Sequence, residues 1–124
     1  MLCVNTGPVQ HRIVCDNSEI KLSCPIGRTL HIHSGFYGRT SDAVCNTTSD
    51  KASLALSRGV KCRRDVSLQL RERCEQRADC ATMVSPLVFR SPVGKACQSA
   101  PKYLAVAFSC DGMLALTRIC LMLL

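Results

Sequence analysis

Apolar and polar positions alternate along several short segments of the chain, which is the pattern of half-buried β-strands. In EIKLSC, residues 19–24, the apolar Ile20 and Leu22 alternate with charged or polar neighbours. Asn17 and Ser18 form a turn signal between this segment and HRIVCD, residues 11–16, so the two segments predict a β-hairpin. Three further segments predict strands: RTLHIH (28–33), ATMVSPLVF (81–89), which Pro86 limits to an edge or a kink, and YLAVAFSC (103–110).

A helix is expected after Asp65, whose side chain can cap the segment VSLQLRERC, residues 66–74. Val66, Leu70 and Cys74 recur there every four positions and would share one helix face. Residues 46–60 are rich in Ser, Thr, Asp and Lys and predict a long loop, with a helical turn at 51–56. The segment GFYGRTSDAVC, residues 35–45, predicts a turn at Gly38, with Tyr37 and Arg39 displayed on the same rim.

The chain has ten cysteines in 124 residues, which bear on how the fold is stabilised and where the protein acts. Such a density is typical of oxidised, extracellular domains held by disulfides. A zinc site would require C-x-x-C pairs, and the closest pair, Cys74 and Cys80, has five residues between its members. We therefore expect an extracellular, small disulfide-rich α+β domain, with mostly antiparallel β-strands, one short helix and long loops. The disulfides would be essential, because the core of so small a domain is marginal.

A glycosylation sequon and the composition of the two ends suggest a secreted protein or a receptor ectodomain. Asn46-Thr47-Thr48 is an N-glycosylation sequon, which agrees with secretion. The first ten residues lack the basic and apolar regions of a signal peptide, so we expect a module of a longer or multi-domain protein. The apolar residues 112–124 are interrupted by Arg118 and are too short to cross a bilayer alone. A last strand, an apolar tail tied by Cys120 and the beginning of an anchor are all compatible with them.

The net charge of +7 is concentrated between residues 58 and 77, where seven basic residues face three acidic ones. Two interpretations stay open. These residues form a solvated basic helix face, or they contact extracellular polyanions through Arg63, Arg64 and Arg71. Nucleic acid is not expected as a partner, because the compartment is oxidising and only five aromatic side chains could stack on bases.

Two tripeptides in a frame of eight cysteines carry a family resemblance. Tyr37-Gly38-Arg39 follows the first two cysteines of the frame, and Lys102-Tyr103-Leu104 precedes the last one. The order resembles the galactose- and rhamnose-binding lectin domain of the sea-urchin egg lectin type, shared by fish-egg lectins and latrophilin adhesion receptors. The resemblance covers residues 15–110 and leaves an N-terminal arm, 1–14, and an apolar C-terminal tail, 111–124.

The resemblance implies four disulfides: Cys15–Cys45, Cys24–Cys110, Cys62–Cys97 and Cys74–Cys80. Cys3 and Cys120 lie outside this frame, on the two arms that the implied Cys24–Cys110 bridge joins, so we expect them to pair.

The resemblance also implies a shallow sugar pocket where the two tripeptides meet. In that pocket Tyr37 forms the lining, Lys102 donates hydrogen bonds to sugar hydroxyls and Asp16 accepts them. Gly38, Arg39 and Tyr103 would support the surrounding loops.

The sequence departs from the family pattern inside this pocket. Lys95-Ala96-Cys97 stands where the family has Asp-Pro-Cys, so a cation replaces an acceptor of hydrogen bonds. Pro86 replaces an asparagine, Ser99 replaces a glycine, and Asp16 is one methylene shorter than the usual glutamate. We keep Lys95 and Ser99 in the expected sugar-binding set.

Two functions follow from this degenerate site. One is a lectin for galactose- or rhamnose-like sugars, or for anionic glycans that Lys95 would favour. The other is an adhesion module that binds protein receptors through the same fold without sugar. We expect no enzyme, no cofactor and no metal, because His11, His31 and His33 belong to no nucleophile motif and His31 and His33 lack a third ligand.

Overall fold

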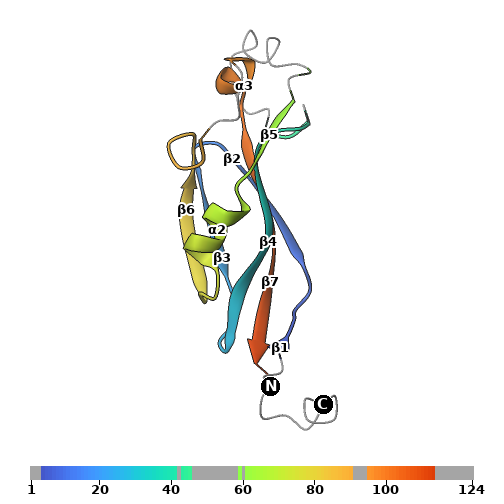
Figure 1. The fold of residues 1–124 in the computed structure, drawn as a ribbon, viewed down its shortest axis with the longest axis vertical. Helices are drawn as coiled ribbons and strands as arrows, with labels where there is room; N and C mark the ends of the chain where they lie inside the picture. Colours follow the sequence, from blue (N-terminus) through green and yellow to red (C-terminus); the bar gives the residue numbers. More distant parts are fainter. Residues whose placement is uncertain (1–3, 42, 46–58, 60, 91–94, 114–124) are drawn as a thin grey trace.

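The computed structural model describes residues 4–41, 43–45, 59, 61–90 and 95–113 (Figure 1). Most of these residues form antiparallel strands, and the helices are few and short, which confirms the expected fold class. The elements in chain order are β1 (Val4–Asn5), β2 (Gln10–Cys15), β3 (Ser18–Ser23), β4 (Arg28–Arg39), β5 (Cys62–Asp65), α2 (Ser67–Cys74), β6 (Asp79–Val84), α3 (Lys95–Ser99) and β7 (Tyr103–Met113).

The strands form two antiparallel sheets. The larger, five-stranded sheet has the order β1-β7-β4-β5, and β2 also pairs with β7. The smaller sheet consists of β3 and β6. The long strands β4 and β7 lie side by side along the length of the molecule (Figure 1). Because β1 and all of β2 except Cys15 lie within the expected N-terminal arm and β7 extends to Met113, the larger sheet includes residues on both sides of 15–110.

The core lies between the two sheets and is covered by α2. The expected alternation is confirmed in β3, whose Ile20 and Leu22 are buried, and in β7, whose Leu104, Val106 and Phe108 are buried. Helix α2 lies so close to β4 that a Cβ atom on Gly35 would meet Leu70 Cδ1 at 2.1 Å. The helix was expected at 66–74, and α2 confirms it with a start one residue later. Asp65 Oδ1 accepts a hydrogen bond of 2.8 Å from the amide of Ser67, the first helical residue.

A β-bulge in β4 determines which residues of its second half face the core. The register against β7 shifts between Ile32 and Ser34. Before the shift Leu30 and Ile32 are buried, and after it the odd-numbered Gly35, Tyr37 and Arg39 are buried, together with Gly38. An extra residue in one strand reverses the side on which later side chains lie. The bulge therefore turns Tyr37 and Arg39 inward.

The expected hairpin of residues 11–16 and 19–24 is wrong. β2 pairs with β7, whereas β3 pairs with β6. Asn17 does form a turn, with a φ of 67°. The amide of Asp16, however, bonds to the carbonyl of Lys102, and the amide of Asn17 bonds to the carbonyl of Val84. The turn is a corner at which the chain passes from one sheet to the other.

The expected turn at Gly38 is also wrong, because β4 continues to Arg39. Gly38 has a φ of 157°, and a Cβ atom there would lie 2.2 Å from the carbonyl oxygen of Cys62. Glycine is needed at this position because β5 approaches β4 closely, with Gly38 opposite Arg63. The side chains of Tyr37 and Arg39 are buried and do not lie on a rim.

The structure contains the disulfides Cys15–Cys45, Cys24–Cys110, Cys62–Cys97 and Cys74–Cys80. These are the same four pairs that the family resemblance implies. The expected Cys3–Cys120 pair, the sequon at Asn46 and the helical turn at 51–56 lie outside the described residues. α3 adds a second short helix to the single one expected. Among the described residues, no helix is both long and apolar enough to cross a membrane.

Candidate carbohydrate-binding site

Three of the expected site residues meet at one end of the larger sheet. The Tyr37 hydroxyl donates a hydrogen bond of 2.5 Å to Oδ1 of Asp16, and Oδ2 of Asp16 lies 3.9 Å from Lys102 Nζ. The strand registers explain the meeting, because Tyr103 of β7 lies opposite both Cys15 of β2 and Gly38 of β4. The residues next to these partners are Asp16, Tyr37 and Lys102. Two long-range strand pairings therefore assemble the group.

The carboxylate of Asp16 is the most exposed group of the three. Its side chain is 16 % exposed, whereas that of Lys102 is 2 % exposed and Tyr37 is fully buried. Burial raises the pKa of the Tyr37 phenol well above its ordinary value, and the hydrogen bond to Asp16 and the charge of Asp16 raise it further. The phenol therefore stays a donor. The phenol bonds to Asp16 from the buried side, while part of the carboxylate faces solvent.

Lys102 makes contacts that differ from those expected. Its ammonium donates to the backbone carbonyls of Cys97, Gln98 and Ala100 at 3.0, 3.1 and 3.1 Å. An ammonium group has three N–H donors, so all of them are taken by protein. The carbonyls at the end of a helix lack partners within the helix, and Lys102 supplies these partners for α3. Burial lowers the pKa of Lys102, and the charge of Asp16 opposes this shift.

The loop-supporting residues join the end of β4 to the segment before β7. Arg39 donates a hydrogen bond of 3.3 Å from Nη1 to the carbonyl of Pro101. The Tyr103 hydroxyl accepts a hydrogen bond of 3.1 Å from the amide of Thr40 and lies 2.7 Å from its Oγ1. The Cys62–Cys97 disulfide links β5 to α3 beside these contacts. The walls of the site are thus fixed by both polar and covalent connections.

Sequence reasoning did not assign Phe89 to the site. Its buried ring lies 5.8 Å from the Tyr37 ring, measured between centroids. Phe89 is the last residue of the apolar run 81–89, in which Pro86 stands in the exposed turn that follows β6. Pro86 interrupts the apolar run, and this was the signal in the sequence that the apolar residues after it do not continue the strand.

The two remaining site candidates belong to α3. Lys95 is its first residue and Ser99 its last, and Ser99 is exposed. The side chain of Lys95 lies outside the described part of the chain.

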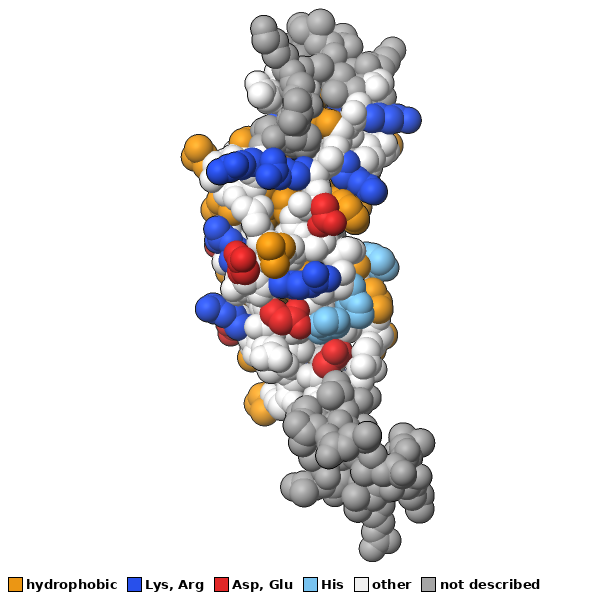
Figure 2. Space-filling view, viewed as in Figure 1, with side chains coloured by type: hydrophobic (Ala, Val, Ile, Leu, Met, Phe, Trp, Pro, Cys, Tyr) orange, Lys and Arg blue, Asp and Glu red, His pale blue; other side chains and the backbone are white. Residues whose placement is uncertain are grey.

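The basic residues do not form one helix face. Arg63 and Arg64 belong to β5, and the guanidinium carbon of Arg63 lies 4.0 Å from the centre of the Phe36 ring. Arg71 lies in α2 and donates hydrogen bonds to the carbonyls of Ile32 and His33, so it ties the helix to β4. Figure 2 shows Lys and Arg side chains distributed over this face of the molecule and mixed with acidic ones.

The histidines have local partners. His31 Nδ1 lies 2.6 Å from Oε2 of Glu75, and His33 Nε2 lies 2.9 Å from Ser109 Oγ. The two rings meet edge to face at 4.6 Å, on the face of β4 opposite Leu30 and Ile32, as expected. His11 is exposed in β2. The described residues contain no group of three or more His, Cys, Asp or Glu side chains that could hold a metal ion.

Comparison with known proteins identifies similar sequences. The family model of the D-galactoside/L-rhamnose binding SUEL lectin domain matches residues 22–110. A D-galactoside-specific lectin of Heliocidaris crassispina is 35% identical over 99 residues, which are 79% of this chain and 87% of the lectin. Latrophilin-like protein 1 of Caenorhabditis elegans is 31% identical over 106 residues, and the match spans 85% of this chain but 10% of that protein. The mouse protein eva-1 homolog C is 30% identical over 105 residues, 82% of this chain and 22% of that protein.

Proposed function

Because the chain belongs to the family of D-galactoside/L-rhamnose-binding SUEL lectin domains, we propose that it is an extracellular carbohydrate-binding module without enzymatic activity. Its sugar site is centred on Asp16. The observation that carries this proposal is the hydrogen bond from the buried Tyr37 hydroxyl to the partly exposed Asp16 carboxylate. A carboxylate that is held in place can accept charge-assisted hydrogen bonds from two neighbouring sugar hydroxyls without losing side-chain entropy.

The other residues of the site have positioning roles in this proposal. Tyr37 orients Asp16, and Lys102 holds the end of α3 beside it through the three carbonyls. Lys95 and Ser99 are the first and last residues of α3, and we assign them to the sugar-binding set on their positions in this helix. With Lys95 in place of the family's carboxylate, the site favours sugars that carry an anionic group.

Substitution of Asp16 by asparagine tests the proposal. Asp16→Asn keeps an oxygen for the Tyr37 hydrogen bond but removes the charge, so sugar affinity should fall about tenfold or more while the melting temperature changes little. Asp79→Asn is the matched control, because Asp79 is an exposed carboxylate on β6 in the smaller sheet. Titration calorimetry with galactose and rhamnose measures both variants. Equal affinities of Asp16→Asn and Asp79→Asn would contradict the site.

A second pair of variants tests the preference for anionic sugars. Lys95→Ala should weaken binding of sulfated or sialylated glycans with little change in melting temperature, and Lys95→Asp should shift the preference toward neutral sugars. Arg63→Gln and Arg64→Gln remove exposed charges from β5 and not from α3, and they serve as controls. If these variants abolish anionic-glycan binding and Lys95→Ala does not, the polyanion surface is on β5.

The second candidate function is a protein-binding adhesion module within a longer protein. Two observations favour it: the donors of Lys102 are occupied by carbonyls, and the chain matches only 10% of latrophilin-like protein 1. A glycan array run beside a screen of receptor ectodomains separates the two functions. Binding to an ectodomain that Asp16→Asn does not weaken, without binding to any glycan, would favour the adhesion module.

A further inference from the structure

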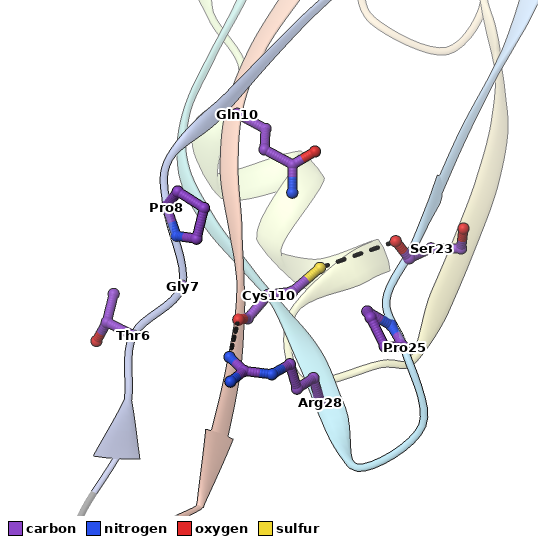
Figure 3. A pocket seen from close by; sticks show the side chains of 8 residues that line it. All are labelled: Thr6, Gly7, Pro8, Gln10, Ser23, Pro25, Arg28 and Cys110. Carbon is purple, nitrogen blue, oxygen red and sulfur yellow. Dashed lines mark hydrogen bonds between the residues drawn. The ribbon is translucent and has the colours of Figure 1, made fainter.

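A pocket lies at the end of the larger sheet opposite Asp16. Its volume is about 380 Å³, within the range of roughly 300–1,000 Å³ that is common for small-molecule sites. The segment between β1 and β2, the connection between β3 and β4, and the far end of β7 surround it (Figure 3). The first part contributes Pro8 and, at the start of β2, Gln10. The second contributes Pro25 and, at the start of β4, Arg28, and β7 contributes Cys110. The exposure of both prolines and of Gln10 leaves the pocket open to solvent.

Arg28 brings a positive charge to this pocket, and none of the described residues that line the pocket carries a carboxylate. Its Nη1 donates a hydrogen bond of 2.9 Å to the carbonyl of Cys110. Its Nε and Nη2 form no hydrogen bond with any residue that the structure describes, and no acidic residue lines the pocket. The carboxylate of Asp111, the next residue in β7, accepts hydrogen bonds from the Gly7 amide and the Ser109 hydroxyl instead. The guanidinium is anchored and retains donors for another acceptor.

Two glycines hold the space that Arg28 occupies. A Cβ atom on Gly112 would lie 3.2 Å from Arg28 Cγ and 3.8 Å from its Cζ. A Cβ atom on Gly7 would lie 2.5 Å from the Cys110 carbonyl oxygen that Arg28 binds, and 3.6 Å from Nη1. Side chains at either glycine would crowd the guanidinium or its anchor. The lack of a Cβ atom at Gly7 and Gly112 therefore leaves room for the Arg28 side chain and its hydrogen bond.

The remaining walls suit a sugar ring. Figure 3 shows the Gln10 amide and the Arg28 guanidinium at opposite ends of the pocket, with Pro8 and Pro25 on its two sides. The Gln10 side chain forms no hydrogen bond within the described residues and offers both a donor and an acceptor. The proline rings supply apolar surface for the C–H groups of a ring. Few polar groups between apolar walls are typical of small-molecule sites.

We propose that this pocket binds a monosaccharide unit that carries a carboxylate, as a second site independent of Asp16. The carboxylate bonds to the free donors of Arg28, since a guanidinium binds planar carboxylates through two parallel hydrogen bonds. A ring hydroxyl bonds to the Gln10 amide, and the ring lies between the two prolines. The net charge of +7 attracts acidic glycans toward either site.

Titration of the whole chain with glucuronate, glucose and acetate tests this site. Glucuronate should bind. Glucose and acetate should each bind at least tenfold more weakly, because glucose lacks the carboxylate and acetate lacks the sugar ring. Glucuronate binding should weaken with added salt. In the Asp16→Asn chain, in which the proposed Asp16 site is disabled, Arg28→Gln should reduce glucuronate binding at least tenfold. Arg12→Gln, which removes the same charge from an exposed position on β2, should leave it unchanged.

Gln10→Glu provides a test that does not disturb the Arg28 anchor. It places a carboxylate in the pocket at an exposed position, so it should reduce glucuronate affinity at least tenfold with little change in melting temperature. Asp16→Asn should leave glucuronate binding at this pocket intact, which separates this site from the proposed one. The proposal is overturned if acetate or a glutamate-containing peptide binds as tightly as glucuronate. It is also overturned if Gln10→Glu binds like the unmodified chain, or if Asp16→Asn alone abolishes binding.

Discussion

The Tyr37 hydroxyl donates its hydrogen bond to Asp16 from the buried side of the site, across a sequence separation of 21 residues. The two residues lie at the ends of β4 and β2, on either side of β7. The β-bulge between Ile32 and Ser34 is what turns Tyr37 toward the core and toward this carboxylate. In the proposed site Tyr37 therefore acts on a sugar only through Asp16, because the tyrosine has no exposed surface of its own.

The raised pKa of Tyr37 predicts a loss of stability in alkaline solution. In the unfolded chain the phenol ionises near its ordinary value of about 10, whereas the folded protein keeps it protonated. Above that pH the folded state binds more protons than the unfolded state, so the free energy of unfolding falls as the pH rises, by up to about 1.4 kcal/mol per pH unit. Tyr37→Phe removes this contribution and should flatten the decline.

Urea unfolding of both proteins between about pH 9 and pH 11.5 measures the difference. The lowered pKa of Lys102 acts in the opposite direction, since it makes stability rise with pH just below the ordinary lysine value. That contribution is present in both proteins, and the comparison isolates Tyr37. Parallel declines for the two proteins would show that the folded state does not hold the Tyr37 proton.

Gly38→Ala should destabilise the fold because β5 leaves no room for a side chain. The new Cβ atom would lie 2.2 Å from the Cys62 carbonyl oxygen and 2.9 Å from Arg63 Cα. Gly27→Ala is the control, because Gly27 has a positive φ of 85° but no atom within 4 Å of the added Cβ. We expect Gly38→Ala to lower the free energy of unfolding by at least about 1 kcal/mol more than Gly27→Ala does. Similar losses in chemical denaturation would contradict the close approach.

Local patterns of the sequence were sufficient to predict much of the fold. The alternation around Ile20 and around Leu104 identified two strands and their buried faces, and the spacing of Val66 and Leu70 identified α2. The hairpin at Asn17 was wrong because a turn signal does not specify the partner of the next strand. The turn at Gly38 was wrong because a positive φ and a close strand approach both require glycine, and only the tertiary structure distinguishes them.

The family resemblance, and not the local pattern, led to Asp16, Tyr37 and Lys102. Their association depends on pairings of β2 and β4 with β7 that no local pattern contains. The contacts of Lys102 could not be predicted, because they need the carbonyls of α3, and α3 had no helical signal in the sequence. The pocket at Arg28 was missed for a similar reason, since segments from three parts of the chain line it.

The disulfides should differ in their contributions to stability according to the loops they close. Cys24–Cys110 spans 86 residues, whereas Cys74–Cys80 spans 6. Because the entropy of the unfolded chain that a disulfide removes grows with the logarithm of loop length, replacing Cys24–Cys110 by two alanines should cost about 2 kcal/mol more than replacing Cys74–Cys80. Each pair has one buried member and one partly buried member, which makes the comparison fair. Equal losses in chemical denaturation would argue against the loop-closure account.

Lys102→Met distinguishes a positioning role of Lys102 from direct contact with sugar. Methionine fills a similar space but leaves the carbonyls of Cys97, Gln98 and Ala100 without their donors. Relief from burying the ammonium offsets part of this loss, and we expect the free energy of unfolding to fall by about 2 kcal/mol. The amides of α3 should then exchange faster with solvent, because the end of the helix is no longer held.

Lys21→Met is the matched control for this substitution. Lys21 is exposed on β3, and its ammonium lies 3.3 Å from Glu19 in a solvent-exposed ion pair, so its replacement should change stability by less than about 1 kcal/mol. If Lys102→Met weakens sugar binding but leaves stability and the exchange of α3 like those of Lys21→Met, the lysine is a direct donor to sugar hydroxyls. If stability and α3 exchange change together with sugar affinity, Lys102 acts by holding α3 beside Asp16.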